Sequence, residues 1–494
     1  SPQGAHRAEI LRSLADALAR AGRGLEAAEA YLQAADSMEP QAQIVMRREA
    51  ALQLLLCGRI DAGSTLATET LRSVGLVIPR TTRTAWAALL VSRARLWLRG
   101  IHFREVREKD IPLGRIERMD HLWALSRGLS MVDVVRGAEF GARHLLLALK
   151  SGDPRHVALG LAVTAGHVAA TAPRSQRARA LMEDLDHLDS KLGDPVLHAY
   201  SPLIGAIHAQ GSGAWRSTLA LADEAERRFT ENCTGVVWEI WTARLFGISS
   251  LFYLGRWRDL DRRITAHLAE ALDRGNAYAL TALRAPYGVL SWLARGDHEG
   301  SRRHIQDATA RWSIRGFHLQ HYWMLMAETF IDLHAGDGAT AWARLRDSWP
   351  DLKNSLLLRL SIVRTELLHA RAASAAAAAL SSRNPGERRA FVKDGLRSSR
   401  SLKRVGSPMA RSLSRTVRAA LAAQDARNEQ AALELESAIR DFDGQEMVGH
   451  AAAARLQLAR LRGLPTPPRE AEEHDFLGDR EAFVRMLAPG FPLP

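Results

Sequence analysis

Cysteine is almost absent from this sequence. Cys57 and Cys233 are the only two cysteines among 494 residues, and neither has a second sulfur or a spaced pair of histidines nearby. Structural zinc sites take four cysteine or histidine ligands at short, regular spacings. The sequence therefore predicts two buried or half-buried free thiols and no structural metal.

Long apolar runs are missing as well. No segment has the roughly 18 to 20 consecutive apolar residues of a membrane-spanning helix, and the N-terminus lacks the basic, apolar and small-residue order of a signal peptide. The composition, 47% hydrophobic and 25% charged, is that of a folded water-soluble protein. We therefore expect a cytoplasmic protein that does not bind membranes.

The motifs of nucleotide and hydrolytic chemistry do not occur. The sequence has no G-x-x-x-x-G-K-[ST] loop, no G-x-G-x-x-G fingerprint, no His-Arg-Asp or Asp-Phe-Gly triplet, no G-x-S-x-G and no H-E-x-x-H. These patterns position phosphates, nucleophiles or metal ions in the common enzyme classes. The sequence therefore predicts neither an enzyme nor a bound cofactor.

What the chain does contain is a repeat. Gly255, Gly296 and Gly336 are separated by 41 and 40 residues, and each stands between a helix-length apolar segment and a second amphipathic segment. The paired segments are 236–254 with 257–272, 276–295 with 299–312, and 317–335 with 339–349. Two antiparallel helices cannot bury both of their faces alone, so neighbouring pairs must stack. The predicted fold is an all-α tetratricopeptide-like superhelix of about eleven helical pairs, with repeats of about 36–44 residues.

The most specific motif lies near the N-terminus. Large, small and aromatic residues follow one another there at the spacing of a tetratricopeptide hairpin: Leu11, Ala15, Leu18, Gly22, Ala27, Tyr31 and Ala34. Small residues let two helix axes approach, and large residues fill the space between them. Further along, Gly152-Asp153-Pro154 and Gly193-Asp194-Pro195 each combine a helix-ending Gly, a capping Asp and a Pro at the first helical position.

Residues 81–118 depart from the regular repeat, and two other stretches have distinct local features. Residues 81–118 are rich in arginine and are predicted to form one long helix with a connection around 110–113. Pro286 is expected to bend the helix over 276–295, because proline lacks the backbone N–H and its ring clashes with the preceding turn. The alanine run over 370–380 is expected to continue a helix, because alanine is the strongest helix former.

The C-terminal third is predicted to return to paired helices. They are expected at 387–402, 408–423, 429–442 and 445–461, followed by a proline-rich turn and a capping helix over 469–486. The sequence divides on this basis into N-terminal repeats (1–80), a basic helix and connector (81–120), central long-helix repeats (121–380), basic helical pairs (381–462) and a terminal turn and cap (463–494).

Tryptophan and arginine on the first helices of the central repeats suggest a partner-binding groove. First helices usually line the concave wall of such arrays, and these residue types most often anchor partners. The candidate groove residues are Trp238, Trp241, Arg244, Arg284, Tyr287, His321 and Trp323. The alternative is that the Trp residues pack between repeats and that each Arg forms an ion pair within the chain.

One polar cluster has the residue types of a metal or acid/base site. His318, His321, Glu328 and Asp332 share one face of a predicted helix, as metal ligands or an acid/base pair would. Single-helix ladders of this kind are frequent and no further ligand can be assigned, so we interpret them as a polar helix face and predict no metal. No catalytic residue is assigned.

Positive charge is concentrated between Arg383 and Arg418, where eleven basic residues face two acidic ones. The candidate basic patch is Arg388, Arg389, Lys393, Arg397, Lys403 and Arg404. Such a stripe suits phosphates, but Phe391 is the only aromatic residue there for base stacking. We therefore favour a solvated face or an acidic protein partner, and keep nucleic-acid binding as the alternative.

Several stretches resemble the C-terminal tetratricopeptide-like region of large bacterial serine/threonine protein kinases that also carry a STAND-type ATPase module. They are residues 14–35 (LADALARAGRGLEAAEAYLQAA), 321–350 around His334-Ala335-Gly336-Asp337, 362–373 (IVRTELLHARAA) and 471–491, which ends in Leu-Ala-Pro-Gly-Phe. The resemblance implies a sensor or docking arm that regulates a kinase or ATPase. No catalytic residue is carried over, because neither module is present in these residues.

The sequence thus predicts a protein-interaction scaffold in bacterial signalling whose partner is a peptide or protein, with the kinase and ATPase domains of the same polypeptide as one candidate. A nucleic-acid-binding regulator that uses residues 383–418 is the rival hypothesis.

Overall fold

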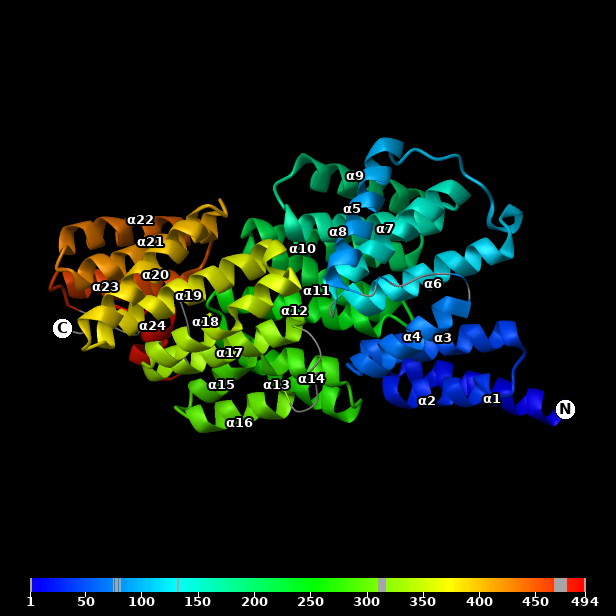
Figure 1. Ribbon diagram of the computed structural model, residues 1–494, viewed down its shortest axis with the longest axis horizontal. Helices are drawn as coiled ribbons and strands as arrows, with labels where there is room; N and C mark the ends of the chain where they lie inside the picture. The colour runs from blue at the N-terminus through cyan, green and yellow to red at the C-terminus, as the bar shows by residue number, and fades with distance from the viewer. Residues whose placement is uncertain are drawn as a thin grey trace.

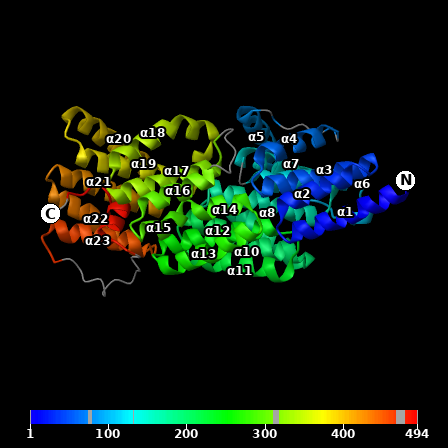
Figure 2. The ribbon, with the colours of Figure 1, turned by 90° about the horizontal axis from the view of Figure 1, so that it is seen from below.

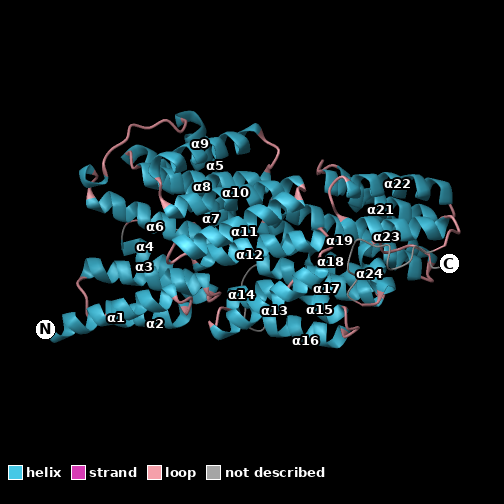
Figure 3. Cartoon of the chain, turned by 180° about the vertical axis from the view of Figure 1, so that it is seen from behind, coloured by secondary structure: helices cyan, strands magenta, loops and turns pink. Residues whose placement is uncertain are grey.

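The chain is built from α-helices joined by short turns. In the computed structural model, the structure describes residues 2–73, 75, 79, 81–130, 133–309, 317–465 and 478–492. Within these ranges there are 24 α-helices, three short 3-10 helices and no strand (Figure 3). None of the described helices is long and apolar enough to cross a membrane.

The helices follow one another as hairpins. In the N-terminal half they are α1 (Pro2–Arg20), α2 (Gly24–Ala35), α3 (Pro40–Leu56), α4 (Ile60–Ser73), α5 (Thr82–Arg99), η1 (Glu108–Asp110), α6 (Leu113–Ser130), α7 (Val134–Ser151), α8 (Pro154–Thr171), α9 (Gln176–Leu192), α10 (Pro195–Ser212), α11 (Trp215–Asn232) and α12 (Val237–Tyr253).

In the C-terminal half they are α13 (Trp257–Asp273), α14 (Ala277–Arg284), η2 (Tyr287–Val289), α15 (Leu290–Leu293), α16 (His298–Thr309), α17 (Leu319–Ala335), α18 (Gly338–Ser355), η3 (Leu357–Arg359), α19 (Ser361–Ser381), α20 (Pro385–Lys403), α21 (Pro408–Gln424), α22 (Asn428–Asp443), α23 (Val448–Leu461) and α24 (Arg480–Leu487).

Successive hairpins stack into an elongated array. The N- and C-terminal ends of the chain lie at opposite ends of its long axis (Figures 1 and 2). Most helices contact the next one along the chain, whereas α5 packs on α7. The first helices of neighbouring hairpins, such as α8 with α10 and α10 with α12, also contact each other. The predicted all-α tetratricopeptide-like superhelix is confirmed.

The N-terminal hairpin has the packing that its spacing predicts. Ala15 and Ala27 are fully buried between α1 and α2, and Tyr31 is 4% exposed. The Tyr31 hydroxyl donates a hydrogen bond of 2.6 Å to Asp16, which ties α2 back to α1. Because alanine allows a close helix approach, this hairpin is compact at its centre.

The predicted turn chemistry is present at the hairpin joints. Gly255, Gly296 and Gly336 have φ angles of 71°, 72° and 85°, a left-handed conformation that favours glycine. At the start of α8, Asp153 accepts a hydrogen bond of 2.8 Å from the backbone N–H of His156, and Pro154 occupies the first helical position. These caps fix where each helix ends and the next begins.

The expectation for residues 81–118 is wrong in its boundaries. The helix ends at Arg99, and the connection extends from Gly100 to residue 112, with the short η1 inside it. Gly100 adopts a φ of 72°, and the Arg99 guanidinium donates to the carbonyl oxygens of Gly100, His102 and Leu149 at 3.0–3.1 Å. Arg99 therefore holds the start of the connection against α7. The sequence pattern predicts that the helix continues through this segment.

The expected bend at Pro286 is also wrong, because the helix is interrupted there. α14 ends at Arg284, the Ala285–Pro286 peptide bond is cis, and the chain continues through η2 into the four-residue α15. Proline cannot donate the hydrogen bond that would carry the helix onward, and its ring clashes with the turn before it. The break leaves Tyr287 at the inner side of the array.

The alanine run forms a continuous helix, as predicted. α19 extends from Ser361 to Ser381, and its alanines from Ala372 to Ala379 are nearly all fully buried. Side chains this small allow α18, α20 and α21 to approach α19 closely. The Gln424 side-chain amide of α21 donates to the Ala376 carbonyl at 2.8 Å and to the Gly490 carbonyl at 2.7 Å, which attaches the C-terminal segment to this helix.

The capping helix at the C-terminus is shorter in the described residues than the sequence suggests. α24 covers Arg480–Leu487, and residues 466–477, where the prediction began it, lie outside the described residues. The division of the chain into five sequence segments stays a prediction.

Helix α12 lies at the centre of the array and contacts both ends of the chain. Near its start, Val237 and Trp241 line a small crevice with Gly22 and Gly24 of the first hairpin. At its end, the Tyr253 ring stacks on His450 of α23 with 5.8 Å between ring centroids. The superhelix therefore curves far enough to bring N-terminal and C-terminal repeats to one helix.

Candidate ligand-binding cavity

A cavity of about 230 Å³ lies between the first helices of the stacked hairpins. Its wall is formed by residues from α6, the start of α7, α8, α10, α12, α14, η2, α17 and α19. The second helices of the same hairpins, α9, α11, α13, α16, α18 and α20, contribute no residue to it. We refer to this space as the central cavity.

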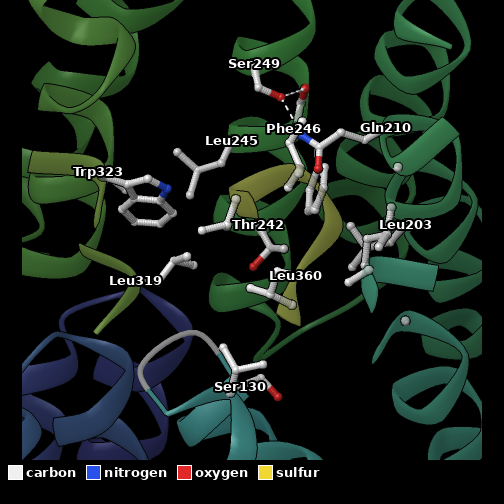
Figure 4. Close-up of a pocket in the computed structure, with 18 of the residues that line it drawn as sticks. Ser130, Leu203, Gln210, Thr242, Leu245, Phe246, Ser249, Leu319, Trp323 and Leu360 are labelled. Atoms are coloured by element: carbon white, nitrogen blue, oxygen red, sulfur yellow. Dashed lines mark hydrogen bonds between the residues drawn. The ribbon is translucent and has the colours of Figure 1, made fainter. Parts of the chain in front are cut away.

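The wall of the central cavity is mostly apolar. Leu203 of α10, Leu245 of α12 and Leu319 of α17 reach it from different hairpins, and Trp323 lies across from Leu203 (Figure 4). Val163, Ile204, Ile207, Phe246, Leu360, Ile362 and Val363 complete the apolar lining. Pockets of this composition bind apolar groups and use a few polar groups to set orientation.

One polar centre of the wall is Glu366 of α19. Its side chain is buried, with 6% of the residue exposed, and three tyrosines from other elements donate hydrogen bonds to it. The Tyr287 hydroxyl lies 3.2 Å from Oε1, Tyr253 donates to the same oxygen, and Tyr322 donates to Oε2. Burial raises the pKa of Glu366 to about 7, and the hydrogen bonds from Tyr253 and Tyr287 oppose that rise.

The second polar centre joins α6, α10 and α12. The Arg127 guanidinium contacts both carboxylate oxygens of Glu239, with Nε and Nη2 at 2.7 and 2.8 Å. The Tyr200 hydroxyl donates to Glu239 at 2.6 Å. Glu239 is 1% exposed, and its buried charge is compensated by this bidentate, charge-assisted ion pair. Burial next to Glu239 raises the pKa of Tyr200 well above its usual value.

The remaining polar groups are neutral. Gln210 of α10 donates to the Ser249 hydroxyl of α12 at 3.0 Å, at the edge seen at the top of Figure 4. Burial lowers the pKa of His167 to about 4, and its Nδ1 lies 2.8 Å from the Val163 carbonyl oxygen. At neutral pH, His167 therefore presents an uncharged imidazole to the cavity.

Three of the seven predicted groove residues line the central cavity. Trp238, Tyr287 and Trp323 are half-buried in its wall. Trp241 is buried against the N-terminal hairpin, Arg284 is buried at the end of α14, and neither is among the lining residues. The expectation that first helices form the concave wall agrees with the arrangement of helices around this cavity.

Arg244 lies on the side of α12 away from the central cavity. Its guanidinium contacts Glu226 of α11 and Glu270 of α13, each at 2.7 Å, and stacks over the Trp241 ring at 4.6 Å. It connects consecutive hairpins through ion pairs within the chain, as the alternative interpretation describes.

The histidine and carboxylate residues of α17 are also engaged within the chain. His321 accepts a hydrogen bond of 3.0 Å from the backbone N–H of His318 at the start of the helix. Asp332 is fully buried and accepts from Arg302 at 2.7 Å, and Glu328 accepts from Arg344 at 2.7 Å. Among the described residues, no group of three His, Cys, Asp or Glu side chains is arranged to hold a metal ion.

The candidate basic patch lies on α20, at the edge of the array in Figure 2. Its side chains are mostly exposed, and helical spacing places Arg389, Lys393, Arg397, Arg400 and Arg404 on one face. We call these five residues the α20 stripe. None of them forms an ion pair with a described residue, whereas Arg388 beside them pairs with Asp425 at 3.0 Å.

Sequence reasoning missed the acidic residue of the cavity. Glu366 shares a helical face with Val363, Leu367 and Ala370, which are all buried. A carboxylate on the apolar face of a helix is unusual, because an uncompensated buried charge is costly. A glutamate at a position where helical spacing predicts an apolar residue is the signal that would have identified it.

Comparison with known proteins finds similarity to solved structures only. No protein-family model matches the chain, and no curated protein matches it. Among solved structures, it is similar to one described as the crystal structure of a Rap protein complexed with competence and sporulation factor. The two share 12% sequence identity over 85% of this chain and 98% of that one, with a TM-score of 0.37. A likeness at this level does not identify a function.

Proposed function

We propose that this chain is a non-catalytic recognition scaffold that binds an apolar segment of a peptide or protein partner in the central cavity. The position of the cavity is the observation that supports this proposal most strongly. Its wall is drawn from the first helices of consecutive hairpins, so one bound segment contacts repeats that are far apart in the sequence. Helical-repeat proteins use their concave surfaces in this way.

The chemistry of the wall supports an apolar ligand. Apolar and aromatic side chains dominate the lining, and the Arg127 charge is already paired with Glu239. Trp238 and Trp323 are half-buried and face the space, and tryptophan side chains often carry much of the binding energy of an interface. A partner that inserts apolar side chains removes this surface from water.

Filling the cavity tests the proposal. Ala170 of α8 is a half-buried lining residue, and Ala269 is an exposed residue of the outer helix α13. A library of displayed peptides is selected on the wild-type protein, and the selected peptides are measured against Ala170→Trp and Ala269→Trp. We expect Ala170→Trp to lose at least about tenfold in affinity, which corresponds to about 1.4 kcal/mol, and Ala269→Trp to bind as the wild type does.

The interpretation requires both variants to fold. Circular dichroism and thermal unfolding that match the wild type establish this. Selected peptides that bind Ala170→Trp as tightly as the wild type place their site elsewhere and contradict the proposal.

We further propose that the partner belongs to a signalling system and that the chain acts in the cytoplasm as the regulatory arm of a serine/threonine kinase with an ATPase module. The support is the resemblance of residues 14–35, 321–350, 362–373 and 471–491 to such arms. The reading frame immediately upstream of Ser1 tests this assignment. A kinase or ATPase domain encoded there supports it, and a frame that encodes neither contradicts it.

The α20 stripe supports a second candidate function, the binding of an anionic partner. Five exposed basic side chains follow one helical face without ion pairs to described residues, so their positive potential is not cancelled locally. Nucleic acid remains an alternative to an acidic protein here. The salt dependence of DNA binding, set out in the Discussion, tests whether the stripe binds a polyanion.

A further inference from the structure

Among the described residues that line the central cavity, Glu366 is the one with a carboxyl group, and three elements besides its own helix donate hydrogen bonds to it. It projects from α19 and accepts hydrogen bonds from Tyr253 of α12, Tyr287 of η2 and Tyr322 of α17. A carboxylate has about four acceptor sites, so three donors leave it able to accept one more hydrogen bond. The tyrosines hold the group in place but supply no positive charge.

No described cation pairs with this carboxyl group. On α19 itself, Arg364 is exposed and Arg371 pairs with Asp394 of α20 at 2.9 Å. On α17, His321 is engaged at its own helix start. On α12, Arg244 contacts two glutamates of the outer helices.

The described histidines and the remaining described arginines near this region do not pair with Glu366 either. Burial lowers the pKa of His369 on α19 to about 4 and that of His450 on α23 to about 3, so both are neutral at pH 7. Arg284 of α14 lies near His304 of α16, whose pKa is lowered to about 4 by burial and by that arginine. Arg127, across the cavity, is held by Glu239.

We infer that the central cavity selects a ligand with an apolar body and one protonated amine, and that Glu366 is the group that pairs with the amine. The inference rests on the proposed function and specifies the chemistry of its ligand. An ammonium group donates charge-assisted hydrogen bonds to a carboxylate, and the aromatic faces of Tyr287, Tyr322 and Trp323, which line the same cavity, attract a cation further. The apolar body contacts Leu203, Leu245 and Leu319.

Three probes that differ only at one end test this inference. Octylamine, octanol and octanoate are titrated into the wild-type protein at pH 8, with binding followed by the fluorescence of the cavity tryptophans and by calorimetry. We expect octylamine to bind about tenfold or more tightly than octanol, because a hydrogen bond to a charged group contributes more than a neutral one. Octanoate is expected to bind most weakly, because its carboxylate repels Glu366.

The variant Glu366→Gln keeps the shape of the side chain and removes its charge. We expect it to bind octylamine and octanol with affinities within about twofold of each other, since the charged partner is gone. The control Glu429→Gln changes an exposed glutamate of α22 outside the cavity, and it should keep the wild-type preference. A wild-type protein that binds all three probes equally, or a Glu366→Gln protein that keeps the preference for the amine, overturns the inference.

A second measurement does not depend on how the variant folds. The affinity of the wild-type protein for octylamine should rise between pH 5 and pH 8, as Glu366 loses its proton, while the affinity for octanol stays constant. An octylamine affinity that does not change over this range contradicts the role of Glu366.

Two further comparisons distinguish a peptide amino terminus from a small amine as the ligand, and a failure of this inference from a failure of the proposed function. An apolar pentapeptide with a free amino terminus is compared with its N-acetylated form. A loss of binding on acetylation identifies a peptide amino terminus as the ligand group, and octylamine binding without any pentapeptide binding identifies a small amine. If the three octyl probes bind equally and Ala170→Trp abolishes their binding, only the preference for an amine is contradicted. If no probe binds at all, the proposed function is contradicted as well.

Discussion

At the scale of single residues, Glu366 gives the chain an unusual dependence on pH. The pKa of this carboxyl group is raised to about 7 by burial, against an ordinary value near 4.3 for glutamate. Between these two values the folded state holds the proton more tightly than the unfolded state does. The contribution of Glu366 to stability is therefore fully present below about pH 4.3 and is lost as the pH rises to about 7.

We predict that Glu366→Gln is more stable than the wild type at pH 8 by about 2 to 3 kcal/mol and equal to it near pH 4.5. The buried histidines act in the opposite direction, because the pKa of His144 and of His450 is lowered to about 3 and their contribution is lost as the pH falls. Urea unfolding of both proteins at each pH isolates the effect, since the histidine contribution cancels in the difference. A difference that does not change with pH contradicts the raised pKa.

The buried pair of Arg127 and Glu239 gives a second prediction at this scale. Replacing Arg127 by Met leaves the Glu239 carboxylate buried with only the Tyr200 hydroxyl as a partner. We expect a loss of about 3 to 5 kcal/mol in the free energy of unfolding.

The double variant Arg127→Met with Glu239→Gln should recover part of that loss, because no uncompensated charge remains. Chemical denaturation of the two single variants and the double variant provides the double-mutant cycle. Equal losses in the single and double variants would show that the pair acts through packing and not through charge.

At the scale of helices and turns, the glycine positions are the most predictable part of this chain. Gly296 has a φ of 72°, and no heavy atom lies within 4 Å of the position that a Cβ would take, so backbone conformation alone decides the cost of a side chain there. We predict that Gly296→Ala lowers the free energy of unfolding by about 1 to 2 kcal/mol.

Gly114 provides the matched control. It lies in the first turn of α6, in an equally open space and without a positive φ, so Gly114→Ala should raise the free energy of unfolding by up to about 1 kcal/mol. Thermal or urea unfolding of both variants compares them, and equal costs would contradict the conformational explanation.

Turn residues and apolar spacing were therefore enough to predict which helices form. They were not enough to predict where some of these helices end. α12, α13, α21 and α22 follow the predicted boundaries closely, because local propensity, capping and burial agree there. The sequence locates the break after Arg284 at Pro286 but does not say whether proline bends or ends a helix there. The long connection after Gly100 depends on tertiary contacts, such as Arg99 binding carbonyl groups of its own turn and of α7. Sequence spacing carries no information on such contacts.

The same distinction holds for the candidate site. Trp238, Tyr287 and Trp323 were predicted because they lie on first helices, and helical periodicity assigns residues to a helix. The inward or outward direction of each helix face depends on how hairpins stack, which is why Arg244 points to the outer helices instead. The three tyrosines around Glu366 come from residues 253, 287 and 322, and no spacing rule relates positions so far apart.

At the scale of the whole molecule, the α20 stripe predicts how the chain responds to salt. We expect a 20-base-pair DNA duplex, used as a polyanionic probe, to bind with an affinity that falls steeply as salt rises, because basic side chains that contact phosphates release counterions. Changing Arg389, Lys393, Arg397 and Arg404 to Glu should abolish this binding. Fluorescence anisotropy at several salt concentrations measures it.

These substitutions should leave the free energy of unfolding nearly unchanged, since the α20 stripe forms no ion pairs with described residues. The control Arg388→Glu reverses one charge that is paired with Asp425 and should leave most of the DNA binding intact. DNA binding that survives reversal of the stripe, or that is insensitive to salt, removes the support for this surface.

The position of α12 between the two ends of the array has a mechanical consequence. Because N-terminal and C-terminal repeats both lie against this one helix, any displacement of α12 changes the contacts at both of its ends. A ligand that shifted α12 from the central cavity would therefore alter the packing of the first hairpin and of α23 in a single movement.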